Sequence, residues 1–203
     1  MNKIIFEPCI YSRPLIDYIT SSNNNAFGLY KNFVDLEIIK KGIAYARYYH
    51  GTQSRKSGEP YYSHPVAVAH ILAKCKFETD IIVAGLLHDT LEDTDLTFDV
   101  IACAFNHNIA VLVEAVSRLH NHDTGRKYSV AEKLLESCTT GDLDALLIKS
   151  SDRVHNMLTL GSMKPAKQEE IRKETLEDIM ALGFVDSMRA SCDKLLAICK
   201  ETR

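Results

Sequence analysis

The sequence lacks the features that would mark a membrane, secreted or nucleic-acid-binding protein. Its longest apolar run, Ile81 to Leu87, is too short to cross a bilayer, and residues 1–11 contain no long apolar core of a signal peptide. The six cysteines form no Cys-x-x-Cys pair and several stand among apolar residues, which favours free buried thiols over disulfides. A net charge of -3 argues against a broad basic face for nucleic acid. We therefore expect a cytoplasmic protein without membrane or nucleic-acid partners, and the sequence leaves its oligomeric state open.

Strand-like alternation is lacking as well, and apolar residues instead recur at intervals of three and four, the helical period. With 203 residues, of which 46% are hydrophobic and 25% charged, the chain is long enough for one buried core. We predict an all-α fold, with residues 1–30 as an N-terminal arm and residues 31–203 as a single domain. Thr79 and Thr97 are expected helix caps, and Ser129-x-x-Glu132 is a capping-box pattern. The expected helices are 34–50, 65–74, 80–92, 99–105, 109–119, one starting near 129, 142–160, and 169–197 with a break near Gly183.

The helix expected at 80–92 carries an unusual group of ionisable residues. At about 100° per residue, His88, Asp89, Glu92 and Asp93 occupy one arc of roughly 140°, while the rest of the helix is apolar. An unpaired buried carboxylate costs several kcal/mol, so a buried cluster has to be protonated, paired or bound to metal. The alternative is that the helix emerges at His88 and that the acids form its solvated end.

Two other segments carry polar residues in positions that suit a site. His64 directly precedes Pro65 at an expected helix start, where its ring is held at a fixed angle. Asp152, Asn156 and Thr159 stand at i, i+4 and i+7 and form a polar stripe on an otherwise apolar helix. Each has an ordinary alternative, a partly buried histidine in the first case and a solvent face in the second.

Taken together, these segments form four ordered sequence blocks between about residue 44 and residue 160. Their spacing resembles that of the HD-domain hydrolases, in particular the hydrolase domain of the RelA/SpoT alarmone enzymes and the single-domain small alarmone hydrolases. The blocks are His50-x-x-Gln53-x-Arg55-Lys56-Ser57-Gly58-Glu59-Pro60-Tyr61, His64-Pro65-Val66, Leu86-Leu87-His88-Asp89-Thr90-x-Glu92-Asp93-Thr94 and Asp152-Arg153-x-His155-Asn156-Met157-x-Thr159-Leu160.

The resemblance implies a helical bundle around a central metal site and a set of residue roles. The implied metal ligands are His64, His88, Asp89 and Asp152, and the implied ion is Mn²⁺, with Zn²⁺ or another divalent ion possible for such donors. Glu92 and Asp93 are the implied catalytic acid pair. The implied substrate-binding residues are Arg55, Lys56, Asn156, Thr159 and, as a weaker candidate, Arg118. The implied reaction is removal of the 3′-pyrophosphate from the guanosine alarmone (p)ppGpp, giving GDP or GTP and pyrophosphate.

The sequence departs from the family pattern around the expected nucleotide pocket. Thr52 stands where the family usually has glycine, Leu158 replaces a common arginine, and Ser150 and Ser151 replace a more apolar pair. After Leu160 the chain does not show the stretch that leads into a synthetase domain in the larger enzymes. The open alternatives are therefore a related hydrolase acting on (p)ppApp or on a phosphate of NADPH, and a catalytically silent nucleotide-binding module.

Overall fold

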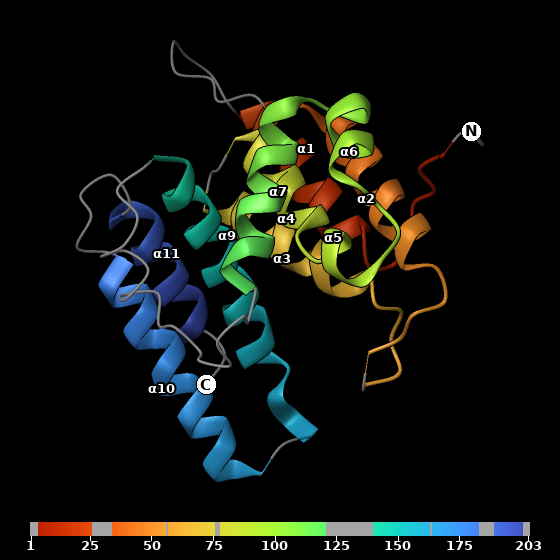
Figure 1. Ribbon diagram of the computed structural model, residues 1–203. Coiled ribbons are helices and arrows are strands. Elements are labelled where there is room, and N and C mark those ends of the chain that lie inside the picture. The colour runs from red at the N-terminus through yellow and green to blue at the C-terminus, as the bar shows by residue number, and fades with distance from the viewer. Residues whose placement is uncertain are drawn as a thin grey trace.

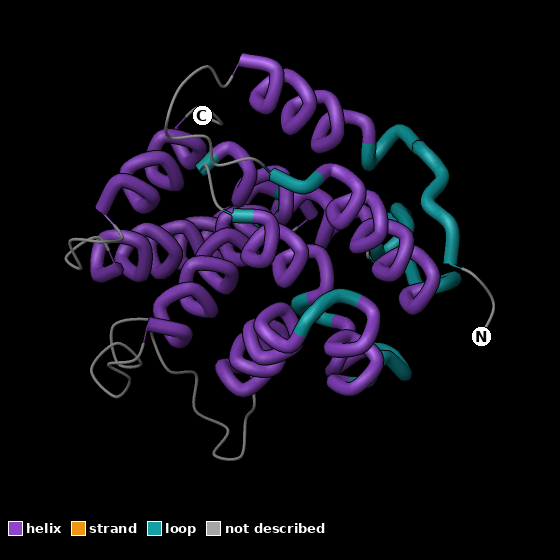
Figure 2. The backbone as a smooth tube through the Cα atoms, turned by 90° about the horizontal axis from the view of Figure 1, so that it is seen from above, coloured by secondary structure: helices purple, strands orange, loops and turns teal. Residues whose placement is uncertain are grey.

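Helices make up most of the described part of the computed structural model (Figure 2). The structure describes residues 4–25, 34–55, 57–75, 78–120, 140–162, 164–182 and 189–200, and within these ranges the only strand-like feature is an isolated bridge between Ser54 and Pro60. The predicted all-α class is confirmed. The helices are α1 (Arg13–Asn25), α2 (Leu36–His50), α3 (Ser63–Lys74), α4 (Thr79–Leu87), α5 (Thr90–Asp93), α6 (Phe98–Ala104), α7 (His107–His120), α9 (Thr140–Leu158), the 3-10 turn η1 (Leu160–Ser162), α10 (Pro165–Leu182) and α11 (Arg189–Lys200).

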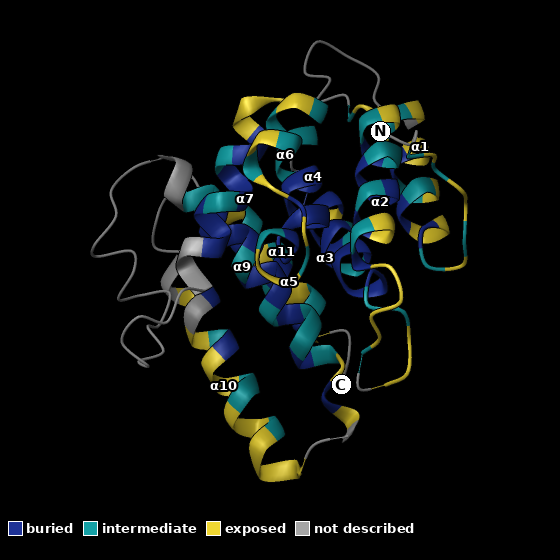
Figure 3. Cartoon of the chain, turned by 45° about the vertical axis from the view of Figure 1, so that its right-hand side comes forward, coloured by how far each residue is buried: buried dark blue, intermediate teal, exposed yellow. Residues whose placement is uncertain are grey.

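The centre of the bundle is formed by α3 and α4 (Figure 1). α3 packs against α1, α4 and α9, and α4 also packs against α2 and α7. Both helices are almost wholly buried and appear dark blue in Figure 3. Gly85 allows their close approach, because a Cβ atom at this position would clash with Leu72 of α3. The two central helices are therefore closely packed and largely shielded from solvent, and they fix the positions of polar groups at their ends.

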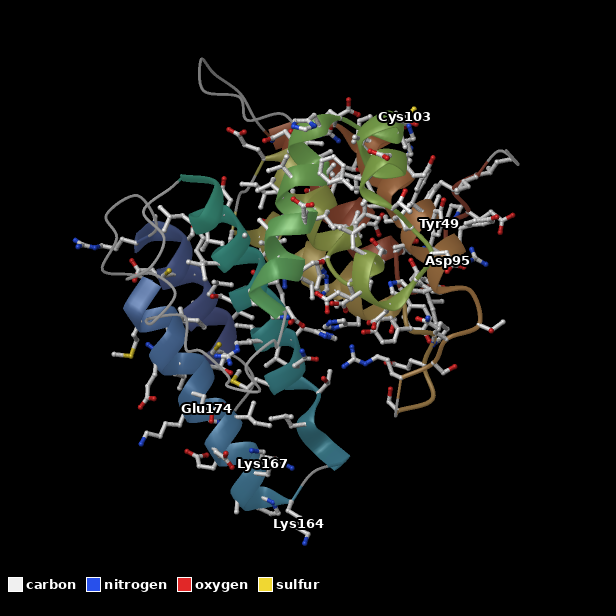
Figure 4. The ribbon with its side chains drawn as sticks, viewed as in Figure 1. Tyr49, Asp95, Cys103, Lys164, Lys167 and Glu174 are labelled. Atoms are coloured by element: carbon white, nitrogen blue, oxygen red, sulfur yellow. The ribbon has the colours of Figure 1, made fainter. Side chains whose placement is uncertain are left out.

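α9 lies between two apolar clusters and contributes to both. Ala145 and Ile148 belong to the main core, whereas Leu146 and Leu147 belong to a second cluster with residues of α10 and α11. The far side of α10 is polar, and the exposed residues Lys164, Lys167 and Glu174 lie along it at the outer edge of the molecule (Figure 4). None of the helices in the described ranges is both long and apolar enough to span a bilayer.

Of the two predicted caps, Thr97 is confirmed and Thr79 is wrong. Thr79 is the first residue of α4, and its hydroxyl accepts a hydrogen bond from Asp35 N at 2.9 Å instead of capping the helix. The Asp35 carboxylate accepts hydrogen bonds from Glu37 N and Ile38 N at the start of α2, and the Thr97 hydroxyl accepts one from Val100 N at the start of α6, as helix N-caps do. α3 begins at Ser63, two residues before the predicted start. Pro65 still falls within the first turn, where its missing N–H leaves no hydrogen bond unmade.

The single helix expected over 80–92 was wrong, since the chain forms α4 and then the short α5. His88 Nδ1 donates to Gly85 O at 2.9 Å, and the Thr90 hydroxyl donates to Leu87 O at 2.6 Å. Side chains that bond nearby carbonyls in this way compete with the helical ladder. His88 and Asp89 therefore occupy a two-residue junction. The capping box at 129–132 and the expected break near Gly183 lie outside the described residues.

The N-terminal region includes a helix that is part of the packed bundle. α1 packs on α3 and buries Leu15 and Ile19, which are 0% and 1% exposed, in the main core. The division of the chain into an arm of residues 1–30 and a domain of residues 31–203 stays a prediction, but α1 shares the core of the domain.

Replacing Ile19 by alanine should lower the free energy of unfolding by about 2–5 kcal/mol, because a buried side chain is removed and a cavity remains. Ile10 is 77% exposed, and Ile10→Ala should change the free energy of unfolding by less than about 0.5 kcal/mol. Urea unfolding followed by circular dichroism measures both values. Equal effects of the two substitutions would contradict the placement of α1 in the core.

Candidate functional site

Three separate chain segments bring their buried polar side chains to one point. His64 comes from the first turn of α3, His88 and Asp89 from the junction after α4, and Asp152 from α9. His64 Nε2 lies 3.0 Å from Asp152 Oδ1 and 3.7 Å from Asp89 Oδ2, and His88 Nε2 lies 2.9 Å from Asp89 Oδ1 and 3.8 Å from Asp152 Oδ1. All four residues are at most 6% exposed. The structure thus brings together every residue predicted to bind metal.

The orientation of His88 is fixed by the backbone. Its Nδ1 donates to Gly85 O, and a carbonyl oxygen can only accept, so Nδ1 carries the ring proton in the neutral form. Nε2 then presents a lone pair to the carboxylates of Asp89 and Asp152, which are acceptors as well. This buried Nε2 makes no hydrogen bond in the structure, although Asp89 Oδ1 lies 2.9 Å away. Only a proton or a metal ion can make such a group of acceptors favourable.

A second histidine supports His64 from the outside. His64 Nδ1 lies 2.7 Å from Nδ1 of His155, so one of these two nitrogens donates to the other. Burial, together with the neighbouring His64, lowers the pKa of His155 to about 3, which keeps the His155 ring neutral. If His155 accepts the proton of His64 Nδ1, the His64 Nε2 lone pair faces the carboxylates, as in His88.

Asp152 is held at both carboxylate oxygens by residues of its own helix. Oδ1 accepts a hydrogen bond of 2.7 Å from Asn156 Nδ2 and faces the two histidines, whereas Oδ2 lies 2.8 Å from Lys149 Nζ. Lys149 stands one turn before Asp152, and its side chain is 15% exposed. These contacts fix the plane of the carboxylate, so that the oxygen facing the cluster is Oδ1.

At each carboxylate of the cluster, neighbouring positive charges and hydrogen bonds oppose the effect of burial on the pKa. Burial alone would raise the pKa of Asp89 and Asp152, but His88 lowers that of Asp89, and His64 with Lys149 holds that of Asp152 well below its usual range. Burial also disfavours a charged His88, yet the two carboxylates outweigh it and raise the pKa of His88 to about 9. In the metal-free protein, a proton on His88 therefore takes the position of a cation among the carboxylates.

The donor set of this cluster fits a divalent metal ion. His64, His88 and Asp89 each offer a ligand atom, and these atoms all lie within 4.8 Å of one another. Asp152 adds a carboxylate oxygen within 3.8 Å of both imidazoles. Imidazole nitrogens and carboxylate oxygens without thiolates suit Mn²⁺, Zn²⁺ or a similar ion. The residues present could therefore hold such an ion without rearrangement of the helices.

The predicted acid pair lies on α5, one turn beyond the junction. Both Glu92 and Asp93 are exposed as residues. Partial burial of the Glu92 carboxyl group and the charge of Asp89 raise its pKa, and the charge of Lys149 partly offsets this. Asp93 is held from two sides, because Gln53 Nε2 donates to its backbone oxygen at 2.8 Å and the Tyr61 hydroxyl contacts its Oδ2 at 3.2 Å.

The predicted substrate-binding residues form a second group beside the first. Arg55 Nη2 lies 3.4 Å from Asn156 Oδ1 and 3.3 Å from Thr159 Oγ1, so three of them are neighbours. Asn156 connects this group to the cluster through its bond to Asp152. Lys56 lies outside the described residues, and so does the side chain of Arg118 on α7.

Three contacts to the cluster were missed in the sequence. Tyr61 and His155 stand within the motif blocks but were assigned no role, and their hydroxyl and imidazole reach Asp89 and His64. Lys149 could have been found, because it precedes Asp152 by three residues and so lies on the same helix face. The contacts of Tyr61 and His155 join distant segments, which residue spacing alone does not reveal.

Comparison with known proteins supports the same family. The family model described as "HD domain" matches residues 42–181. The chain is 39% identical over 163 residues to the bifunctional (p)ppGpp synthase/hydrolase SpoT of Escherichia coli K12. The aligned region covers 79% of this chain and 23% of that protein. It is 42% identical over 149 residues to a GTP pyrophosphokinase of Myxococcus xanthus, covering 70% of this chain and 20% of that protein. The chain thus spans about a quarter of the length of these curated relatives.

A solved structure shares the fold as well. It is described as a metazoan orthologue of SpoT that hydrolyses ppGpp, and it superimposes with a TM-score of 0.62 over 87% of this chain and 98% of that chain, at 22% identity. The resemblance predicted from the four sequence blocks is confirmed by these matches. Since the family model covers well over half of the sequence, this chain belongs to the HD-domain family.

Proposed function

We propose that this chain is a Mn²⁺-dependent 3′-pyrophosphohydrolase of guanosine alarmones, converting (p)ppGpp into GDP or GTP and pyrophosphate. The observation that carries the proposal is the convergence of two buried imidazole nitrogens and two buried carboxylates, an arrangement that a cation stabilises. The substrate class is supported by relatives named guanosine-3′,5′-bis(diphosphate) 3′-pyrophosphohydrolase, one of which, from Escherichia coli O157:H7, is 39% identical. We assign His64, His88, Asp89 and Asp152 as ligands of the ion.

The geometry supports a simple division of work in the proposed reaction. A divalent ion held by His64, His88, Asp89 and Asp152 would make a water more acidic near neutral pH and would offset negative charge on the phosphoryl oxygens. Glu92 and Asp93, which are exposed and follow the junction on α5, orient the water and accept its proton. The water oxygen forms a bond to the phosphorus that is attached to the ribose 3′ oxygen. The bond between this phosphorus and the 3′ oxygen breaks, and the proton ends on the 3′ oxygen. One water is consumed and pyrophosphate leaves.

The neighbouring group of residues suits the nucleotide. Arg55, Asn156 and Thr159 lie together beside Asp152. The planar guanidinium of Arg55 can donate two parallel hydrogen bonds to a phosphate or stack flat against a base. Lys56 and Arg118 remain proposed contacts to the nucleotide. Lys149 places a positive charge behind Asp152 and close to Glu92, so it balances part of the negative charge of the site.

Incubation of the purified protein with ppGpp and Mn²⁺ should release pyrophosphate and GDP. Glu92→Gln should keep the ion but lower the rate by about 10²- to 10⁴-fold, the usual contribution of a proton-transfer residue. Glu177→Gln, at an exposed position of α10, should leave the rate unchanged. Products separated by ion-exchange chromatography measure this. Release from (p)ppApp or of phosphate from NADPH, with none from ppGpp, would overturn the guanosine assignment, and binding without release of any product would indicate a silent module.

Replacing Asp152 by asparagine should weaken Mn²⁺ binding by more than about 100-fold, because loss of a ligand charge exceeds the 10- to 100-fold cost of losing a supporting residue. Isothermal titration calorimetry measures the affinity, and circular dichroism checks the helical content. The control Asp193→Asn changes an exposed aspartate of α11 and should bind as the wild type does. An unchanged affinity and stoichiometry in Asp152→Asn would show that the ligand set is wrong.

The dependence of turnover on pH should reveal the link between Lys149 and Glu92. Burial raises the pKa of Glu92 and the charge of Lys149 lowers it, so Lys149→Met should raise this pKa further. Because Glu92 has to be ionised to accept a proton, activity is lost as the pH falls through this pKa. The acid limb of kcat at saturating Mn²⁺ should therefore move to higher pH in Lys149→Met and stay in place in Lys173→Met, an exposed control. A shift to lower pH would contradict the assignment.

A further inference from the structure

A tyrosine hydroxyl lies between a proposed metal ligand and a proposed catalytic acid. Tyr61 OH is 3.0 Å from Oδ2 of Asp89, an assigned metal ligand, and 3.2 Å from Oδ2 of Asp93, an assigned catalytic acid. These carboxylates stand four residues apart, and Asp93 N donates to Asp89 O at 3.0 Å, so they project from the same side of one helical turn. A phenol has a single proton, and it can donate fully to only one of the two acceptors at a time.

The tyrosine ring is firmly held, so the hydroxyl has little freedom to leave this position. Tyr61 packs against His50 with ring centroids 4.6 Å apart and meets the edge of His64 at 6.2 Å. Gln53 accepts a hydrogen bond from His50 Nδ1 and donates to the backbone oxygen of Asp93. The ring and the second carboxylate are thus fixed by one small network in which His50 and Gln53 take part.

The two acceptors change in strength when a cation enters the cluster. Without an ion, the Tyr61 hydroxyl lies within hydrogen-bonding distance of both carboxylates, and Asp89 has only the proton on His88 as a cation beside it. With an ion bound, the charge on Asp89 is shared with the metal, and this carboxylate becomes the poorer acceptor. Asp93 has no contact with the cluster histidines among those described for its side chain, so it keeps its acceptor strength. The hydrogen bond should therefore move from Asp89 toward Asp93 on ion binding.

We propose that Tyr61 is a positioning residue that turns the Asp89 carboxylate toward the ion and, once the ion is bound, holds the Asp93 carboxylate in place for the water. This inference rests on the proposed function, since it takes Asp89 as a ligand and Asp93 as part of the acid pair. It gives the site a way to align its catalytic acid only when the metal is present. The hydroxyl, and not the ring, carries this role.

The adjacent tyrosine provides a matched control. Tyr62 precedes α3 as Tyr61 does, but its hydroxyl contacts Cys9 Sγ at 3.5 Å and its ring meets Tyr11, on the side of the N-terminal segment. Tyr61→Phe and Tyr62→Phe each remove one hydroxyl and keep the ring. Any general effect of losing a phenol near α3 should therefore appear in both variants, whereas an effect on the ion should appear only in the first.

Calorimetric titration with Mn²⁺ alone tests the first half of the proposal. Tyr61→Phe should weaken Mn²⁺ binding by about 10- to 100-fold, as loss of a residue that orients a ligand does in other metal sites, and Tyr62→Phe should stay within about twofold of the wild type. At saturating Mn²⁺, kcat of Tyr61→Phe should still be lower and KM unchanged, because Asp93 loses its partner. Equal affinities in the two variants, or a kcat fully restored by excess Mn²⁺, would overturn the proposal.

A measurement on the wild-type protein avoids any loss of folding in the variant. The ¹³Cζ signal of Tyr61, assigned by through-bond NMR, should shift when the diamagnetic ion Mg²⁺ or Zn²⁺ is added, while that of Tyr62 should not. An unchanged Tyr61 signal at saturation would contradict the switch. Asp152→Asn in the same titration distinguishes a failure of the proposed function from a failure of the role of Tyr61. A wild-type protein that binds no ion would refute the proposed function. Ion binding that is lost in Asp152→Asn but kept in Tyr61→Phe would refute only the role of Tyr61.

Discussion

The hydrogen bond from His88 to the carbonyl of Gly85 determines the character of the whole site. It fixes the ring proton on Nδ1 and turns the Nε2 lone pair toward carboxylates that are acceptors themselves. In a fully buried position this arrangement is unfavourable unless a positive charge joins it. The same bond takes part in ending α4, so the end of the central helix and the orientation of the ligand have one cause. Gly85 has two roles here. Its carbonyl oxygen accepts the hydrogen bond from His88, and its lack of a side chain lets α3 approach α4 and bring His64 close to His88.

α9 completes the site because it is held from both sides. Its apolar residues face two different clusters, one in the main bundle and one with α10 and α11, so the helix has little freedom to rotate. On such a helix a single turn can carry Lys149, Asp152 and Asn156 in fixed relation to one another. Rotation of α9 would expose apolar surface on one side and separate the carboxylate from the histidines on the other. The second cluster, distant from the chemistry, thus contributes to the geometry of the ligands through α9.

Much of this fold could be predicted from the sequence, and the reasons for success and failure are physical. Helical periodicity and the capping residue Thr97 are local signals, and they predicted most of the helices. Helix α1 was not predicted, and the cap expected at Thr79 is wrong. The junction at His88 and Asp89 was missed because side-chain bonds to carbonyls ended a helix whose apolar pattern continues beyond it. The four proposed ligands were predicted from the motif blocks, not from spacing alone, and the structure brings their side chains together. The contacts of Tyr61 and His155 could not be derived, since they join segments whose relative placement only the packed bundle defines.

The site separates into a part that sets the chemistry and a part that can set the substrate. The cluster of histidines and aspartates is buried, and in the proposed function it supplies the metal chemistry without contacting the base. Arg55 and Thr159 are more accessible, and they are linked to the cluster indirectly, through Asn156 and through the bond from Thr159 Oγ1 to His155 O. Changes among their neighbours can therefore alter nucleotide contacts without removing a proposed ligand of the ion. The departures from the family pattern at Thr52 and Leu158 fall near this outer group in the sequence. A chain of this kind can therefore keep a metal centre typical of HD domains while its choice of base is determined by a few exposed positions, and tests of the centre and tests of the nucleotide answer different questions.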